Sequence, residues 1–124
     1  MYYIFTSYLP SKEVIEYKIF KKEKNKVVLQ AKDGSSLILY KMVDGLSILK
    51  KDEELKIQFK LIENKKSTLT ICLQKQNTKM EMEIFTRKLK IEDEVYKFEY
   101  DLLDKGNLVH ICKVDIKGVK ENGD

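Results

Sequence analysis

The stretch STLTICL, residues 67–73, decides the fold class of this protein. Its larger apolar residues, Leu69, Ile71 and Leu73, occupy every second position and are separated by threonine and cysteine. Successive side chains of a β-strand point to opposite faces, whereas a helix with this pattern would spread its apolar residues around its whole circumference. The stretch therefore predicts a strand with one buried face.

The same alternation recurs on both sides of this stretch. Leu55, Ile57, Phe59 and Leu61, for example, are separated by lysine and glutamine. Turn residues such as Asp33-Gly34 and Asp44-Gly45 separate the alternating segments at intervals of about ten residues. The pattern predicts strands at residues 2–9, 14–20, 26–31, 36–43, 46–50, 54–63, 67–74, 79–91, 95–103 and 108–117.

The short connections determine how these strands pair. A parallel crossover needs a dozen or more residues, so consecutive strands joined this tightly must be antiparallel neighbours. A meander of about ten strands leaves two exposed edges unless it closes on itself. We therefore expect an all-β fold, a single antiparallel meander over residues 1–118 that closes into a barrel or curls into a sandwich, followed by a frayed tail at 119–124.

One predicted strand, at residues 79–91, breaks its own alternation. Its apolar residues lie at even positions through Met80, Met82 and Ile84, and then at odd positions from Phe85 onward. A shift of one residue would turn a whole face inside out, so a β-bulge or sharp bend is expected at Ile84 and Phe85. Such a bend lets one strand serve two sides of a barrel.

Composition excludes several classes of function. The chain has 124 residues and a formal charge of +4 that comes from lysine, because Arg87 is the sole arginine. Charge runs of mixed sign, such as residues 50–54, are interpreted as solvated turns. Nucleic-acid binding is therefore not favoured. With two cysteines, no apolar run long enough for a membrane helix and no signal peptide, we expect a cytoplasmic protein with no membrane association.

Several segments resemble a known family. They are Val14-Ile15-Glu16-Tyr17, residues 25–29, Val43-Asp44-Gly45, residues 55–59, Met80-Glu81-Met82, Thr86-Arg87-Lys88-Leu89, and residues 96–102 and 110–118. Their order and spacing resemble those of the YwiB-like family, small bacterial proteins to which no biochemical activity is assigned. The chain departs from the family between Ile19 and Lys26, where a Thr-Gly step is missing, and in a shorter loop around Asp33. The resemblance covers about four-fifths of the chain and implies a calycin-like (lipocalin-like) β-barrel.

The inventory of reactive residues argues against an enzyme. The chain has one histidine and none of the G-x-S-x-G, H-E-x-x-H or glycine-rich phosphate motifs. His110, Cys72 and Cys112 would supply three of the four ligands of a structural zinc site, and Cys72 lies on the polar face of its strand. We expect no catalytic residues, no metal and no cofactor.

The inward faces of the last strands hold the candidate ligand-binding residues. Small-molecule pockets combine aromatic walls with a few polar groups. Alternation places aromatic residues and His110 on the inward faces of neighbouring strands, where His110 is either a core residue or a polar anchor for a ligand. The candidate interior residues are Phe59, Tyr96, Phe98, Tyr100 and His110.

Arg87 is the candidate for closing one end of the barrel. It shares its parity with Phe85 and Leu89, so its guanidinium is expected to point inward or to cap an end, unless its stem lies over the barrel rim with the charge in solvent. An inward guanidinium needs a carboxylate partner, and Glu94, Glu99 and Asp101 are candidates. The resemblance implies that such a residue packs on an N-terminal aromatic, here Tyr2, Tyr3 or Phe5.

These observations favour a non-enzymatic barrel whose interior binds a small apolar ligand. The alternative is an interaction module that acts through its outer surface. Such a module would form a homodimer through a strand edge or through the doubly apolar residues 37–40, or would bind RNA weakly through lysines.

Overall fold

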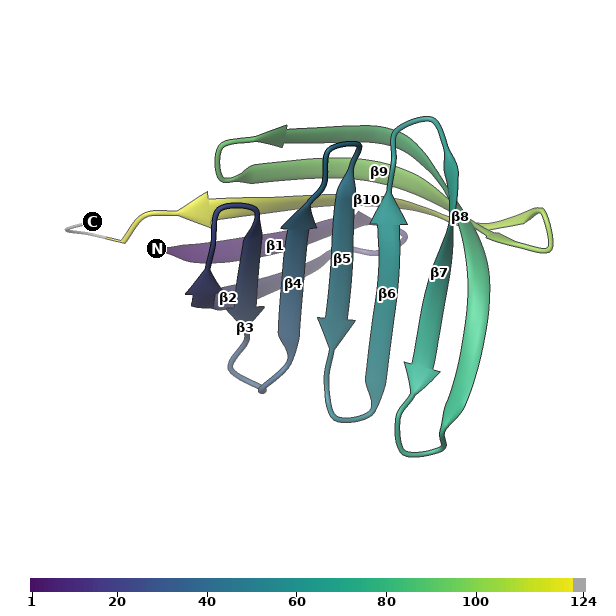
Figure 1. Cartoon of the computed structure of the whole chain (residues 1–124), viewed down its shortest axis with the longest axis horizontal. Helices are drawn as coiled ribbons and strands as arrows, with labels where there is room; N and C mark the ends of the chain where they lie inside the picture. Colours follow the sequence, from purple (N-terminus) through teal and green to yellow (C-terminus); the bar gives the residue numbers. More distant parts are fainter. Residues whose placement is uncertain (122–124) are drawn as a thin grey trace.

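A computed structural model describes residues 1–121 and contains ten antiparallel strands and no helix (Figure 1). All ten predicted strands are present, with ends that differ by a few residues. Val119 is the last residue of β10, and residues 122–124 of the expected tail lie outside the described residues. The strands are β1 (Tyr2–Leu9), β2 (Glu13–Lys22), β3 (Lys26–Gln30), β4 (Ser36–Lys41), β5 (Leu46–Lys51), β6 (Leu55–Leu61), β7 (Lys66–Leu73), β8 (Thr78–Glu92), β9 (Val95–Asp104) and β10 (Asn107–Val119).

The strands form one closed barrel in which every consecutive pair is hydrogen-bonded. Closure occurs between the first and last strands, whose register runs from Tyr2 opposite Val119 to Leu9 opposite Lys113. The predicted meander and its closure are therefore both confirmed. Turn residues behave as expected too, since Gly34 and Asn77 adopt positive φ angles of 89° and 50°.

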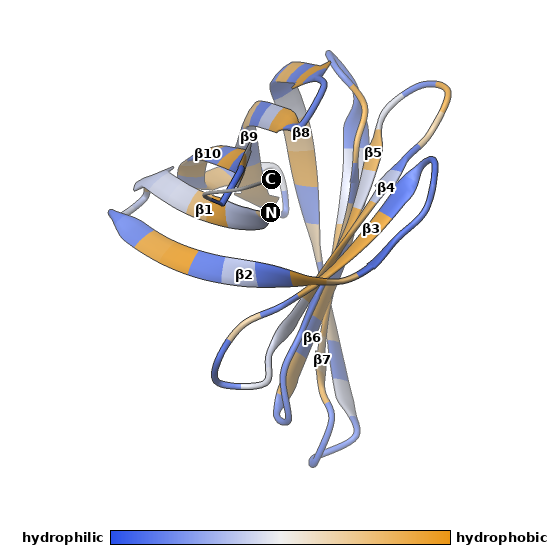
Figure 2. Ribbon diagram, turned by 90° about the vertical axis from the view of Figure 1, so that its left-hand side faces the viewer, coloured by the Kyte–Doolittle hydropathy of each residue, from blue (hydrophilic) through white to orange (hydrophobic). Residues whose placement is uncertain are grey.

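The barrel is flattened into two layers whose strands cross. In Figure 1, β3 to β7 run vertically, whereas β1, β9 and β10 run across them. Figure 2 shows the layers from the side and the alternation of hydrophilic and hydrophobic residues along β2. Crossed layers need corner strands that belong to both. β8 is one of them, because its first half pairs with β7 and its second half pairs with β9.

β8 changes layers at a bulge, as predicted, but the bulge lies further along the strand. The register shifts between Thr86 and Lys88, so the bulged residue is Arg87. Ile84 and Thr86 both remain fully buried, and the inward parity changes only at Leu89. The expected site at Ile84 and Phe85 is wrong because a buried threonine continues the inward series and Phe85 is an apolar residue on the outer face.

One end of the barrel is closed by a polar cluster of Tyr3, Glu94 and Lys22. The Tyr3 hydroxyl donates a hydrogen bond to Oε2 of Glu94, and Lys22 Nζ lies 2.7 Å from Oε1. The hydrogen bond from Gly118 N to Glu94 O is 2.8 Å long. A Cβ at position 118 would lie 2.8 Å from Glu94 Cβ, so only glycine allows this approach.

Candidate functional site

The opposite end of the barrel contains an apolar pocket of about 260 Å³. Strands β1, β4 to β7, β9 and β10 contribute its walls with residues that alternation turns inward. Lining residues at this end, such as Lys50, Ile57 and Ile71, are only partly buried. The pocket therefore reaches solvent. Its lining residues are Phe5, Leu37, Ile48, Lys50, Ile57, Phe59, Leu69, Ile71, Phe98, Tyr100, Leu102, Val114 and Ile116.

Three aromatic rings form one wall of the pocket. Tyr100 lies 5.4 Å from Phe59 and 6.2 Å from Phe98, measured between ring centroids. Burial, and then the adjacent Cys112 thiol, raise the pKa of Tyr100 well above its usual range. The hydroxyl therefore stays neutral at physiological pH. The wall is rigid and apolar, with one neutral polar group.

The structure brings together three of the five residues predicted to line the interior. Phe59, Phe98 and Tyr100 line the pocket. Tyr96 is buried but does not line it. It lies near the closed end, because it follows Glu94 by two residues and its ring lies 5.7 Å from Lys41 Nζ. Burial, and then Glu94, raise its pKa.

The expectation that His110 lies inside the barrel is wrong, because the side chain is exposed. His110 has the expected parity, since it pairs with Leu102, whose side chain lines the pocket. However, the hairpin of β9 and β10 extends past the end of the barrel (Figure 1), and its register shifts between Leu108 and His110. Parity gives the face of a strand but not the depth at which a residue lies, so alternation alone predicted the wrong environment.

Of the orientations considered for Arg87, the inward one is wrong. Arg87 lies on the outer face, where its Nε donates to Oδ1 and Oδ2 of Asp101 at 2.8 and 2.9 Å. Its side chain is 54% exposed, whereas that of Asp101 is 10% exposed. The bulge turns the guanidinium outward, and Asp101 is the partner among the three candidates. The polar cluster of Tyr3, Glu94 and Lys22 occupies the end that Arg87 was expected to close.

Lys50 is the pocket residue that sequence reasoning missed. It was included in a mixed charge run and interpreted as part of a solvated turn. Yet it continues the inward series of Leu46 and Ile48 along β5, and among residues 1–121 it is the one charged residue that lines the pocket. The alternation of β5 contained this signal, which the charge pattern obscured.

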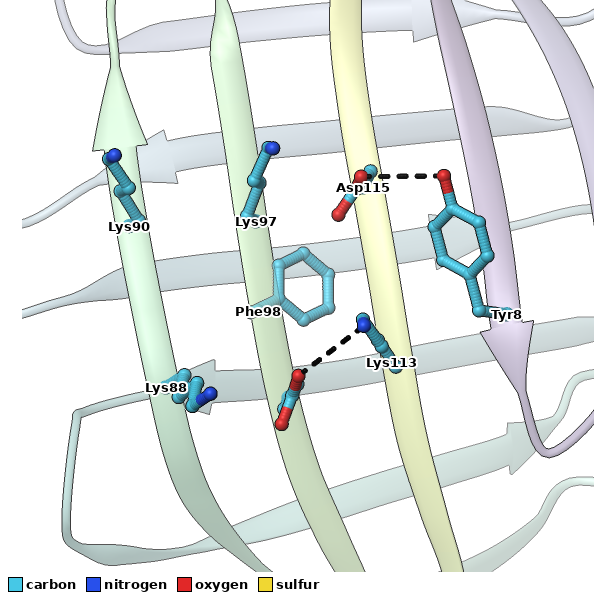
Figure 3. A pocket seen from close by; sticks show the side chains of 8 residues that line it. Tyr8, Lys88, Lys90, Lys97, Phe98, Lys113 and Asp115 are labelled. Carbon is cyan, nitrogen blue, oxygen red and sulfur yellow. Dashed lines mark hydrogen bonds and ion pairs between the residues drawn. The ribbon is translucent and has the colours of Figure 1, made fainter.

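The outer surface of β8, β9, β10 and β1 has a separate hollow of about 390 Å³ (Figure 3). Four lysines line it, Lys88, Lys90, Lys97 and Lys113, together with two carboxylates and Tyr8. Lys113 lies 3.8 Å from Glu99, and the Tyr8 hydroxyl lies 3.5 Å from Asp115. Mixed charges and long contacts make this hollow a solvated face without an organised site.

Other reactive chemistry is sparse in the part of the chain that the structure describes. Among residues 1–121 no three His, Cys, Asp or Glu side chains gather closely enough to hold a metal ion. Both cysteines are free, and burial raises the pKa of the Cys112 thiol. Over the same residues, no helix has the length and apolarity needed to cross a membrane.

Fold and pocket together define a small meander β-barrel with a hollow interior that is open at one end. Comparison with solved structures finds the crystal structure of the ywiB protein from Bacillus subtilis, with a TM-score of 0.58 over 96% of this chain and 89% of that chain. The two sequences are 16% identical, so the likeness shows a shared fold. The predicted YwiB-like resemblance is thereby supported. No family model and no curated protein matches the sequence.

Proposed function

We propose that this protein binds a small, largely apolar molecule in the interior pocket of its barrel. The proposal depends on one observation, which is an apolar pocket that remains open to solvent in an otherwise well-packed barrel. Side chains usually fill the interior of small barrels, so an unfilled and accessible interior suggests a ligand site. The proposal assigns the protein no catalytic role.

The pocket volume limits the size of the ligand. Pockets for drug-sized molecules measure roughly 300–1,000 Å³, and this pocket, at about 260 Å³, is slightly smaller. Each buried methylene contributes about 0.8 kcal/mol. A short aliphatic chain or a single small ring would therefore fill the pocket and bind with modest affinity.

Octanol is a suitable first probe because it is small, neutral and mostly apolar. We expect its addition to shift the NMR signals of Ile57, Leu69 and Ile71, which line the pocket. Native mass spectrometry of the protein purified from its own host would show whether a natural ligand is retained.

Two tryptophan variants on β7 make this test specific. Ile71→Trp places a large ring in the pocket and should abolish octanol binding. Thr68→Trp lies on the exposed outer face of the same strand and should leave binding unchanged. Octanol binding that survives Ile71→Trp, or an absence of octanol shifts in the wild-type protein, would overturn the proposal.

Action through the outer surface has weaker support. Leu37 and Leu39 are buried inward, which leaves Ile38 and Tyr40 as the outer residues of β4. For RNA binding, the exposed aromatic residues on which bases could stack, Tyr8 and Phe20 among them, lie on different strands, and Lys12 and Lys113 lie 4.3 and 5.8 Å from the Tyr8 ring. A concentration-dependent dimer in light scattering would favour the interaction module instead.

A further inference from the structure

Lys50 lies at the solvent end of the pocket. It is the second-last residue of β5, and its neighbours across the strands are Leu37 on β4 and Ile57 on β6. Both neighbours line the pocket as Lys50 does. The ammonium group therefore belongs to an otherwise apolar wall.

Among the residues that the structure describes, no carboxylate forms an ion pair with this ammonium group. Six other lysines do form such pairs, namely Lys21, Lys22, Lys66, Lys79, Lys90 and Lys113. Its closest recorded partner is the Phe5 ring, whose centroid lies 5.2 Å from Nζ. The Asp33 carboxylate is near enough for an electrostatic interaction with Lys50, but it forms no ion pair with it. This carboxylate is exposed and accepts hydrogen bonds from Ser35 N at 2.9 Å and Ser35 Oγ at 2.6 Å.

An unpaired ammonium beside apolar groups favours a ligand of matching charge. A partly desolvated charge is stabilised by an opposite charge that also hydrogen-bonds to it. A single lysine matches one negative charge, whereas a phosphate usually recruits several donors or an arginine fork. A carboxylate is the simplest group that satisfies these conditions.

We infer that the pocket takes a small amphipathic monocarboxylate, with the carboxylate at Lys50 Nζ and the apolar tail against Phe59 and Leu69. This inference rests on the proposed function and specifies the ligand class for the same pocket. The charged group lies at the mouth, where water still solvates it in part, and the tail replaces water deeper in the barrel.

Three probes with the same number of carbons separate charge from apolar burial in the wild-type protein. Octanoate, octanol and octylamine each have eight carbons, but the first carbon of octanoate belongs to the carboxylate, so its apolar tail is one methylene shorter and apolar burial alone would favour the other two. We expect octanoate to bind most tightly nonetheless, and octylamine most weakly, in calorimetry or NMR titration. Raising the salt concentration should weaken octanoate binding and leave octanol binding nearly unchanged.

Two lysine variants locate the effect. Lys50→Met keeps the apolar stem and removes the charge, so octanoate affinity should fall about tenfold while octanol affinity is retained. Lys51→Met removes the adjacent lysine, which is exposed on the other face of β5, and should change neither affinity.

The outcomes distinguish this inference from the proposed function. Octanol binding with no preference for octanoate, or an equal octanoate affinity in Lys50→Met, would overturn the inference and leave the apolar pocket intact. Failure of both octanol and octanoate to bind would overturn the proposed function and the inference together. The probe comparison in the wild-type protein needs no variant, so it decides the question even if Lys50→Met folds poorly.

Discussion

Glu94 lies in the turn between β8 and β9 and holds the closed end of the barrel together through its contacts with β1 and β2. It accepts hydrogen bonds from Lys22 and Tyr3, which lower the pKa of its carboxyl below the usual value, with Lys22 as the larger cause. Burial and the same carboxylate raise the pKa of Tyr3 well above its ordinary range. The pair therefore consists of a neutral phenol donor and an ionised acceptor at physiological pH.

Replacing this carboxylate should make the free energy of unfolding depend less on pH in the acidic range. Because the pKa of Glu94 is lowered in the folded state, its stabilising effect is complete above the unfolded value of about 4.5 and is lost as pH falls through the folded value. We expect Glu94→Gln to lower the free energy of unfolding by about 1 kcal/mol at pH 7, and this difference to shrink below pH 4.5. Urea unfolding at several pH values measures it.

Glu92 provides the matched control for this prediction. It is the last residue of β8, two positions before Glu94, but its side chain is 70% exposed and its contact with Lys90 Nζ is 3.5 Å long. Glu92→Gln should change stability little at any pH. A Glu94→Gln variant that behaves like Glu92→Gln would contradict the assigned role of Glu94.

At the scale of elements, the bulge of β8 connects the two layers and is tied to β9 by Arg87. The Nε of Arg87 contacts both oxygens of Asp101, which is almost fully buried on the outer side of β9. A buried carboxylate that loses its donor bears the desolvation penalty of its charge.

Removing this donor should therefore destabilise the barrel. We expect Arg87→Met to reduce the free energy of unfolding by about 1–3 kcal/mol, because Asp101 is left buried without its partner. The double variant Arg87→Met, Asp101→Leu should recover part of the loss, since it removes the charge as well. Chemical denaturation measures both. A double variant less stable than the sum of the single effects would contradict this account of the pair.

For the whole molecule, closure places the first and last strands side by side. Tyr2 pairs with Val119, and Figure 1 shows the start of β1 and the end of β10 on the same side of the barrel. The β7–β8 turn at the other end is exposed and contains Asn77. The barrel therefore depends on the pairing of β1 with β10 and not on which strands carry the chain ends.

A circular permutant tests this view. Joining the present termini with a short glycine-serine linker and opening the chain at Asn77 should give the same barrel with a similar melting temperature. Opening the chain inside β9 instead, at Phe98, should prevent folding, because that residue belongs to the buried core. Circular dichroism and two-dimensional NMR compare both with the parent. A permutant opened at Asn77 that does not fold would contradict the prediction.

Alternation and short turns are local properties of the chain. The strands, their antiparallel order and their inward faces could therefore be predicted from the sequence alone. It correctly placed Phe59, Phe98 and Tyr100 at the interior for the same reason. Only the tertiary structure decided how far along the barrel each inward residue lies, which moved His110 to an exposed hairpin and brought Lys50 into the pocket. It also decided which charges meet, as with Arg87 and Asp101, because strand register and bulges depend on contacts between distant segments.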